Sequence, residues 1–159
     1  WVDWELTPRK QALLDFTKAL TALRRSQPVL QRRNFFLGKT LDDSAFRDLV
    51  WFHPQGRELG AADWNDPALH CFGFFLGGDA ITARDPTGAR VMGDSLLVYF
   101  NAGAQPVPVV LPGKAWAATW ESIFETASVM PRPLKCEAGE TVQVPGSSVL
   151  VLRHAHDEG

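Results

Sequence analysis

The chain changes abruptly from one helical stretch to a long series of short apolar runs, and this change limits its fold. In residues 7–27, Leu13, Phe16, Leu20 and Leu23 recur every three or four positions, which is the spacing of one apolar helix face. After about residue 30 the apolar runs are short and alternate with clusters of Gly, Pro, Asn and Asp. This pattern predicts a mainly β fold that is preceded by one long amphipathic α-helix.

The ends of the helix are marked by residue type. Thr7 is a good N-cap, Pro8 suits the first helical position, and Pro28 ends the run. Residues 8–33 hold seven Lys or Arg and one acid, whereas residues 34–159 hold nine basic and fifteen acidic residues. We interpret this asymmetry as a cationic helix face rather than a nucleic-acid site, because no aromatic residues alternate with the charges.

The remaining apolar runs predict about eight strands in an antiparallel β-sandwich with Greek-key connections. Turns are indicated where Pro stands second and Gly fourth, as in residues 53–56 and 85–88. The expected strands are 34–37, 48–53, 70–76, 95–101, 107–111, 115–124, 141–144 and 148–154. In the last of these, valines and leucines alternate, so we expect that strand to be covered on both sides.

Composition excludes several classes of protein. The 159 residues are 45% hydrophobic and have a mean hydropathy of −0.10, and no apolar run approaches the ~20 residues of a membrane span. The net charge of −2 gives no basic field for nucleic acid. Cys71 and Cys136 are too few for a disulfide framework, which favours a reducing compartment. We therefore expect neither a membrane nor a nucleic acid as partner.

The common catalytic motifs are not found in the sequence. The glycines near residues 73–78 do not have nucleotide-binding spacing, and no G-x-S-x-G motif occurs. Residues 63–66 begin like a calcium loop, but Pro67 follows where the pattern does not allow it. Neither a nucleophile nor an acid with an orienting partner can be identified. The sequence predicts no cofactor, no metal site and no catalytic residue in this stretch.

Six tryptophans remain to be explained, and indole rings serve both cores and sugar-binding surfaces. Three lie in strand patterns and are expected in the core: Trp51, Trp116 and Trp120. Trp64 stands in a polar loop, where it is either a loop anchor or a surface contact. Trp1 and Trp4 are candidates for sugar contact, the alternative being packing against a domain outside this chain. The start at an aromatic and acidic segment predicts that the chain is a piece of a longer protein.

The order of short motifs resembles the isoamylase-type glycogen debranching enzymes of the α-amylase superfamily. Trp1-Val2-Asp3-Trp4 directly before the helix is similar to the end of their catalytic barrel, and residues 32–38 are similar to the crossing into their C-terminal β domain. The other matching segments are 23–30, 48–52, 56–59, 63–67, 72–78 and 94–102.

This resemblance implies a parent enzyme that hydrolyses α-1,6-glucosidic branch linkages in glycogen or limit dextrins. Such enzymes retain the anomeric configuration and use an Asp nucleophile, a Glu acid/base and a second Asp. All three family positions lie upstream of Trp1, so none is assigned here. Residues 1–28 would be the end of the (β/α)8 barrel, including its last helix, and residues 29–159 the C-terminal β-sandwich.

The resemblance also implies partners and candidate binding residues. Trp1, Asp3 and Trp4 match the segment after the eighth barrel strand, where barrel loops build active sites, so they are candidates for substrate binding. Trp64 is a further substrate-binding candidate. The expected partners are the upstream barrel and, through the parent enzyme, an α-glucan. A cytoplasmic location is implied as well.

Three functions follow from these arguments. The first is a non-catalytic C-terminal domain that stabilises the barrel of a debranching enzyme and is inactive alone. The alternative is an independent glycan-binding β-sandwich that uses loop tryptophans. A protein-interaction domain of immunoglobulin type is disfavoured, because the chain lacks the Cys…Trp…Cys framework.

Overall fold

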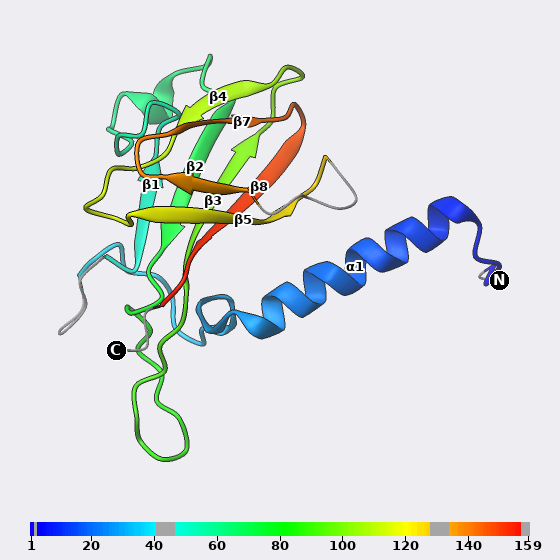
Figure 1. Ribbon diagram of the computed structural model, residues 1–159, viewed down its shortest axis with the longest axis horizontal. Coiled ribbons are helices and arrows are strands. Elements are labelled where there is room, and N and C mark those ends of the chain that lie inside the picture. Colours follow the sequence, from blue (N-terminus) through cyan, green and yellow to red (C-terminus); the bar gives the residue numbers. More distant parts are fainter. Residues whose placement is uncertain (2, 41–46, 128–133, 157–159) are drawn as a thin grey trace.

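A computed structural model describes residues 1, 3–40, 47–127 and 134–156, and it confirms a mainly β fold led by one helix (Figure 1). The helices are α1 (Pro8–Ser26) and the short 3-10 helices η1 (Pro28–Gln31) and η2 (Asp63–Asn65). The strands are β1 (Leu49–Phe52), β2 (Cys71–Leu76), β3 (Ser95–Asn101), β4 (Val107–Val110), β5 (Thr119–Glu125), β6 (Lys135–Glu137), β7 (Thr141–Val144) and β8 (Ser148–His154). Within these ranges, no helix has the length and apolar character needed to cross a bilayer.

The strands form two antiparallel sheets that face each other. The larger sheet has the order β1-β2-β3-β8-β5-β6, and the smaller sheet pairs β4 with β7. The chain leaves the larger sheet after β3 and returns with β8, which lies between β3 and β5. This return of a late strand to the centre of the sheet agrees with the predicted Greek-key sandwich.

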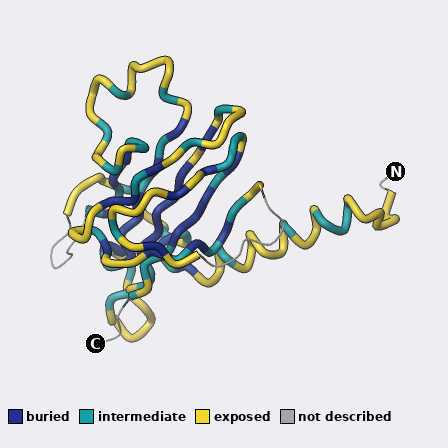
Figure 2. The backbone as a smooth tube through the Cα atoms, turned by 45° about the horizontal axis from the view of Figure 1, so that its top comes forward, coloured by how far each residue is buried: buried dark blue, intermediate teal, exposed yellow. Residues whose placement is uncertain are grey.

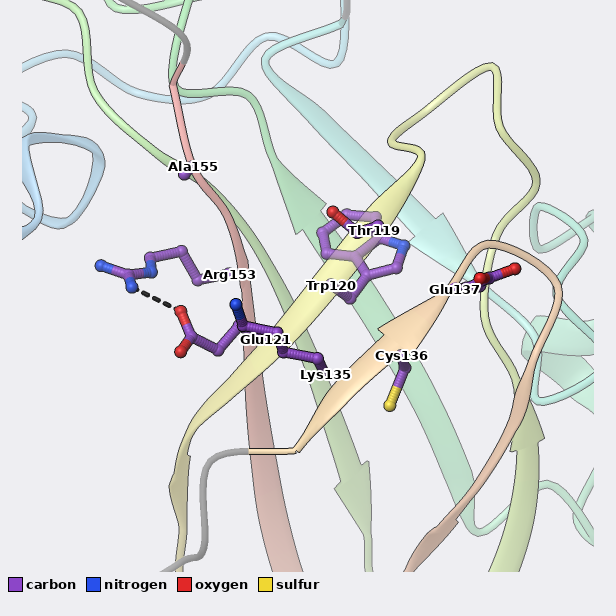
Figure 3. Close-up of a pocket in the computed structure, with 8 residues that line it drawn as sticks. All are labelled: Thr119, Trp120, Glu121, Lys135, Cys136, Glu137, Arg153 and Ala155. Atoms are coloured by element: carbon purple, nitrogen blue, oxygen red, sulfur yellow. Dashed lines mark hydrogen bonds and ion pairs between the residues drawn. The ribbon is translucent and has the colours of Figure 1, made fainter.

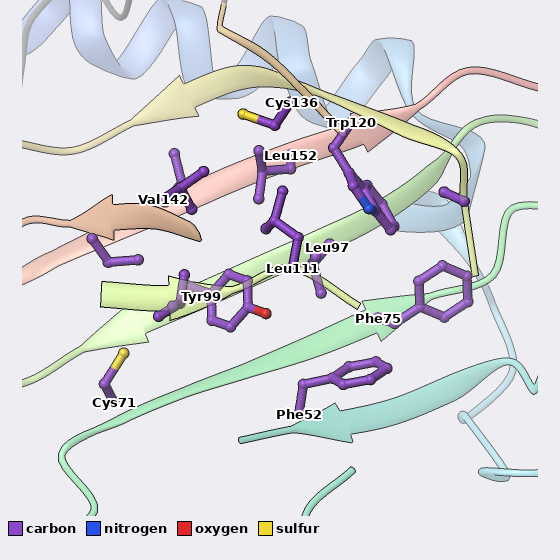
Figure 4. Packing of buried hydrophobic residues seen from close by; sticks show 14 of the residues in the cluster. Phe52, Cys71, Phe75, Leu97, Tyr99, Leu111, Trp120, Cys136, Val142 and Leu152 are labelled. Atoms are coloured by element: carbon purple, nitrogen blue, oxygen red, sulfur yellow. The ribbon is translucent and has the colours of Figure 1, made fainter. Parts of the chain in front are cut away.

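The main core lies between the two sheets and is built from the inward-facing side chains (Figure 4). Trp120 and Tyr99 are its largest members and are 1% and 0% exposed. Trp116 packs edge-on against Phe52 and Phe75, with ring centroids 5.2 and 5.1 Å apart. The core position predicted for Trp120 is therefore confirmed. Trp116 is only partly buried and lies in a turn before β5, not in the predicted strand.

A glycine makes room for the tyrosine at the centre of this core. Gly73 lies beside Tyr99 in the register of β2 and β3. A Cβ atom at Gly73 would lie only 2.6 Å from Cε1 and 2.7 Å from Cδ1 of the Tyr99 ring. The absence of a side chain on Gly73 thus allows the ring of Tyr99 to lie flat under β2, where burial raises the pKa of its hydroxyl.

The larger sheet is apolar on its outer face as well. There Val98, Val151 and Phe124 form a second cluster, against which Phe16 and Leu23 of α1 pack. The rings of Phe16 and Phe124 have centroids 5.3 Å apart. The two-sided cover predicted for β8 is confirmed by this arrangement.

Helix α1 itself begins and ends close to the predicted residues. Thr7 is the N-cap, and its side-chain oxygen accepts a hydrogen bond from the Lys10 backbone N–H. No residue of α1 is fully buried, and most of the helix projects away from the sandwich (Figures 1 and 2).

The segment that joins the helix to the sandwich corrects one prediction, because residues 34–37 form no strand. The carboxylate of Asp48, 0% exposed, accepts hydrogen bonds from the backbone N–H groups of Leu37 and Gly38 at 2.9 and 2.8 Å. It also pairs with the Arg32 guanidinium at 3.1 Å. The side chain of Asp48 thus takes the donors that a neighbouring strand would have used, and Gly38 adopts a left-handed φ of 64°.

A short strand was missed in the sequence. In β6 the buried Cys136 stands between exposed Lys135 and Glu137, which is the alternation of a half-buried strand over only three residues. It pairs with β5 through Trp120 and Cys136. Three residues are too few for periodicity to be recognised in the sequence alone.

We predict that Gly73→Ala destabilises the sandwich by about 1–3 kcal/mol, because the added methyl group overpacks the site of the fixed Tyr99 ring. Urea denaturation measures the change. Gly113→Ala is the matched control, since a Cβ atom there meets no heavy atom within 4 Å. Equal midpoints for the two variants would contradict this description of the core.

Candidate functional site

The acidic side chains with shifted pKa values are all held in the ionised form. In the described residues, each carboxyl pKa that is shifted lies below its usual range: those of Asp3, Asp63, Asp85 and Glu121. The largest cause in each case is a side-chain hydrogen bond, from Lys10, Arg57, Thr87 and Arg153 respectively. A general acid must hold its proton near neutral pH, which requires a raised pKa. These four carboxylates therefore suit ion pairing rather than proton donation.

A cavity of about 430 Å³ lies between β5, β6 and the end of β8 (Figure 3). Glu121 and Arg153, which form an ion pair, line it together with Trp120 and Cys136. Burial, followed by the charge of Glu140, raises the pKa of the Cys136 thiol. A thiol that keeps its proton is a poor nucleophile. Cys136 is therefore suited to packing in the sheet and not to nucleophilic catalysis.

The outer face of β1, β2 and β3 carries a continuous group of aromatic rings, which we call the aromatic strip. Its members are Trp51, Trp64, Phe72, Phe74 and Phe100. The Trp51 and Trp64 rings meet edge to face at 5.3 Å, and Phe72 and Phe100 lie 5.8 Å apart. Trp64 is 54% exposed and Phe100 36% exposed, so the strip is open to solvent along part of its length. Trp51 belongs to this strip and is only half-buried, so its predicted core position is wrong.

The loop before β2 holds Trp64 in a fixed position at the edge of the strip. Arg57 donates two hydrogen bonds to the Asp63 carboxylate, at 2.6 and 2.7 Å. The same carboxylate accepts the Gly60 N–H at 2.7 Å, and the Asn65 amide donates to the Ala61 carbonyl at 3.1 Å. Residues 63–66, which resemble the start of a calcium loop, thus form hydrogen bonds that close the turn of η2. Among the described residues, no three His, Cys, Asp or Glu side chains gather as a metal site.

An apolar groove of about 530 Å³ continues from the strip toward the linker. Trp51 and Phe74 form its sheet side, and Leu30, Phe35 and Phe36 form its linker side. Phe35 is 91% exposed at the rim of the groove. The outer face therefore offers apolar surface from the aromatic strip to the foot of α1.

The candidate residues at the start of the chain lie far from the strip. Trp1 and Trp4 are almost fully exposed at the distal end of α1, and Asp3 pairs with Lys10 of the first helical turn (Figure 1). The structure does not bring these three together with Trp64. Their predicted role in substrate binding remains a prediction.

The apolar stripe of α1 is covered over only part of its length. Phe16 and Leu23 pack on the outer face of the larger sheet, whereas Leu13 and Leu20 are 65% and 45% exposed. A helix gains most of its stability from burying its apolar face. Helix α1 therefore presents a surface that the rest of the described chain does not cover.

Sequence reasoning identified Trp64 but missed its neighbours in the strip. The signal was present in β2, where Phe72 and Phe74 alternate with Gly73 and Phe75. Large side chains on both faces of one strand indicate that both faces meet other groups. The pairing of β1 with β2, which places Trp51 beside Phe74, could not be obtained from single strands.

These features define a helix-led antiparallel β-sandwich with exposed apolar residues on its helix and on the outer face of its larger sheet. Residues 48–155 match the family described as isoamylase, C-terminal. Because this match covers more than half of the chain, the protein belongs to the isoamylase C-terminal family.

Known proteins with similar sequences include a glycogen operon protein homolog and an isoamylase. The chain is 39% identical over 155 residues to a glycogen operon protein GlgX homolog of Mycobacterium tuberculosis, covering 96% of this chain and 22% of that protein. It is 24% identical over 154 residues to an isoamylase of Flavobacterium sp, covering 95% of this chain and 18% of that protein. The chain thus spans about a fifth of the length of these relatives.

Solved structures share the fold at low sequence identity. A pullulanase from Bacillus acidopullulyticus matches with a TM-score of 0.54 and 16% identity, over 92% of this chain and 14% of that one. A type I pullulanase from Bacillus subtilis, complexed with maltose, matches with a TM-score of 0.53 and 15% identity, over 97% and 17% of the two chains. At these identities the likeness concerns the fold alone.

We predict that Asp63 keeps its charge to unusually low pH. Its pKa is held well below its usual range, first by the side-chain bonds from Arg57 and then by the Gly60 N–H. A depressed folded-state pKa stabilises the loop above the unfolded pKa of about 3.9, and this contribution is lost as the pH falls toward the folded value. In Arg57→Gln, we expect the carboxyl titration followed by NMR to move upward.

Glu121 provides the internal control, because its lowered pKa depends first on Arg153 and not on Arg57. Its titration should be the same in both proteins. An unchanged Asp63 titration in Arg57→Gln would show that the pair does not hold the loop.

Proposed function

We propose that this chain is the non-catalytic C-terminal domain of a glycogen debranching enzyme and that it stabilises the catalytic barrel of that enzyme. The parent would hydrolyse α-1,6-glucosidic branch linkages in glycogen or limit dextrins with retention of configuration, in the cytoplasm. Residues 1–28 would close the barrel and residues 29–159 form the supporting sandwich. Family membership and the glycogen-related names of the relatives support this proposal.

The observation that carries the proposal is the divided stripe of α1. One part of the stripe, Phe16 and Leu23, is packed on the sandwich, and another part, Leu13 and Leu20, is left exposed. A helix whose single apolar stripe is only partly covered by the sandwich is suited to bury the rest of that stripe against a second domain. Each apolar side chain that a second domain fully buries would contribute roughly 1.5–3 kcal/mol.

If a second domain covers the exposed part of the α1 stripe in the longer protein, the isolated chain should self-associate through that stripe. Exposed Leu13 and Leu20 would meet the same surface of another copy, so light scattering should show a mass that rises with concentration. The double variant Leu13→Gln/Leu20→Gln should reduce this association without lowering the stability of the sandwich.

Ala22→Gln is the matched control, because Ala22 is exposed on the opposite side of α1 and should leave association unchanged. A clean monomer of the unmodified chain at high concentration would oppose the idea of an uncovered stripe.

The non-catalytic role predicts that the isolated chain releases no reducing ends from glycogen. A longer protein that includes the proposed barrel should release them under the same conditions. Turnover by this chain at ordinary enzyme rates of about 1 per second or more would refute the proposal.

A further inference from the structure

We propose that a cleft between the linker and the connection from β2 to β3, which we call the linker cleft, binds a phosphate monoester of a small polyol, such as a sugar phosphate. One wall is formed by residues 31–34, at and after the end of η1, and the other by residues 81–86. The cleft has a volume of about 570 Å³, which is in the range of small-molecule sites and larger than a single inorganic ion needs. This inference goes beyond the proposed function and does not depend on it.

The first argument is the charge of the lining. Three arginines line the linker cleft, Arg32, Arg33 and Arg84, against one acid, Asp85. The fully buried Asp48 pairs with Arg32, so one positive charge remains in excess after both acids are counted. The whole chain has a net charge of −2, and this local excess of the opposite sign favours an anionic ligand.

The second argument is that exposed arginines stand on both walls. Arg33, on the linker, has no hydrogen-bond or ion-pair partner among the described residues. Arg84, on the opposite wall, donates from Nη1 to the Gly88 carbonyl at 2.8 Å, which leaves other N–H groups of its guanidinium for a ligand. Guanidinium groups bind phosphate oxygens through pairs of N–H donors. A phosphate group in the cleft would therefore find donors on each side.

The third argument is that the two walls are joined before any ligand binds. Arg32 donates to the Ala80 carbonyl at 3.2 Å, and the side-chain amide of Asn34 donates to the Thr82 hydroxyl at 3.0 Å. A site that is already ordered loses less entropy when a ligand enters. The side chain of Arg32 is only 5% exposed, and its buried Nε–H has no acceptor within the described ranges. A buried donor without an acceptor is costly, and a bound anion can satisfy it.

The neutral residues of the lining indicate the rest of the ligand. Gln31, Asn34 and Thr82 carry amide and hydroxyl groups, which exchange hydrogen bonds with the hydroxyl groups of a polyol. In the part of the chain that the structure describes, no aromatic ring lines the linker cleft. A nucleotide base would therefore lack a stacking partner, and a phosphorylated sugar fits the lining better than a nucleotide does.

The test titrates the chain with glucose 6-phosphate and follows the heat by calorimetry at low ionic strength. We expect saturable binding with a dissociation constant on the order of 1 mM or tighter, and binding of inorganic phosphate and of glucose that is at least about tenfold weaker. Equal binding of inorganic phosphate would overturn the polyol part of the assignment, and equal binding of glucose would overturn the phosphate part. Absence of glucose 6-phosphate binding would overturn the site.

Variants of Arg33 locate the binding. Arg33→Gln should weaken it by at least about tenfold, and Arg33→Lys, which keeps the charge, should weaken it less. Arg9→Gln is the matched control, because it removes the same charge from an exposed arginine of α1 that does not line the cleft. Equal affinity of Arg33→Gln and Arg9→Gln would refute a local site and leave only general charge attraction.

Arg84→Gln tests the second wall. It should weaken binding as Arg33→Gln does, and unchanged binding at an unchanged melting temperature would refute contact from both walls. Because Arg33 is exposed and has no partner among the described residues, Arg33→Gln should melt at the same temperature as the unmodified chain. A negative result here leaves the support role of α1 untouched, because that role is measured by association and not by ligand binding.

Discussion

The larger sheet buries apolar side chains on both faces, but the smaller sheet covers only one of them. Between the sheets, Trp120 and Tyr99 form a closed core with almost no exposed surface. On the outer face, Val98, Val151 and Phe124 need another cover, and α1 supplies it through Phe16 and Leu23. The position of α1, the apolar groove and the aromatic strip are consequences of this unequal cover.

Hydrogen bonds and an ion pair in the linker between α1 and β1 fix the position of the helix on the larger sheet. Asp48, at the entry to β1, accepts hydrogen bonds from the backbone of Leu37 and Gly38 and pairs with Arg32, which follows η1. Breaking a buried ion pair by removing one partner typically costs about 3–5 kcal/mol. The pair therefore fixes the path between helix and sheet, and with it the face on which α1 lies.

Much of the fold could be predicted from local signals, because those signals act within a few residues. Thr7, Pro8 and Pro28 mark the ends of α1, and Gly56 and Gly88 close their predicted turns by donating their N–H groups to His53 and Asp85. The assignments that failed depended on partners distant in sequence. Residues 34–37 resemble a strand until the carboxylate of Asp48 takes their hydrogen bonds.

The candidate site, too, could be predicted only where local signals determine it. The sequence allows Trp64 to be either a loop anchor or a surface contact, and the structure gives it both an anchoring ring, Trp51, and an exposed surface. The remaining rings of the strip come from β1, β2 and β3, whose order in the sheet is a property of the whole fold. Trp1, Asp3 and Trp4 lie at the distal end of α1, and their role stays a prediction.

We propose that the exposed part of α1 packs against a domain outside this chain. Amide hydrogen exchange tests it most directly, because exchange reports local opening. In the isolated chain, at low concentration, amides in the N-terminal half of α1 should exchange at least about a hundredfold faster than those of β3 and β8, and they should become protected in a longer protein with the proposed barrel. Protection of the whole helix equal to that of the central strands, in the isolated monomer, would contradict the account.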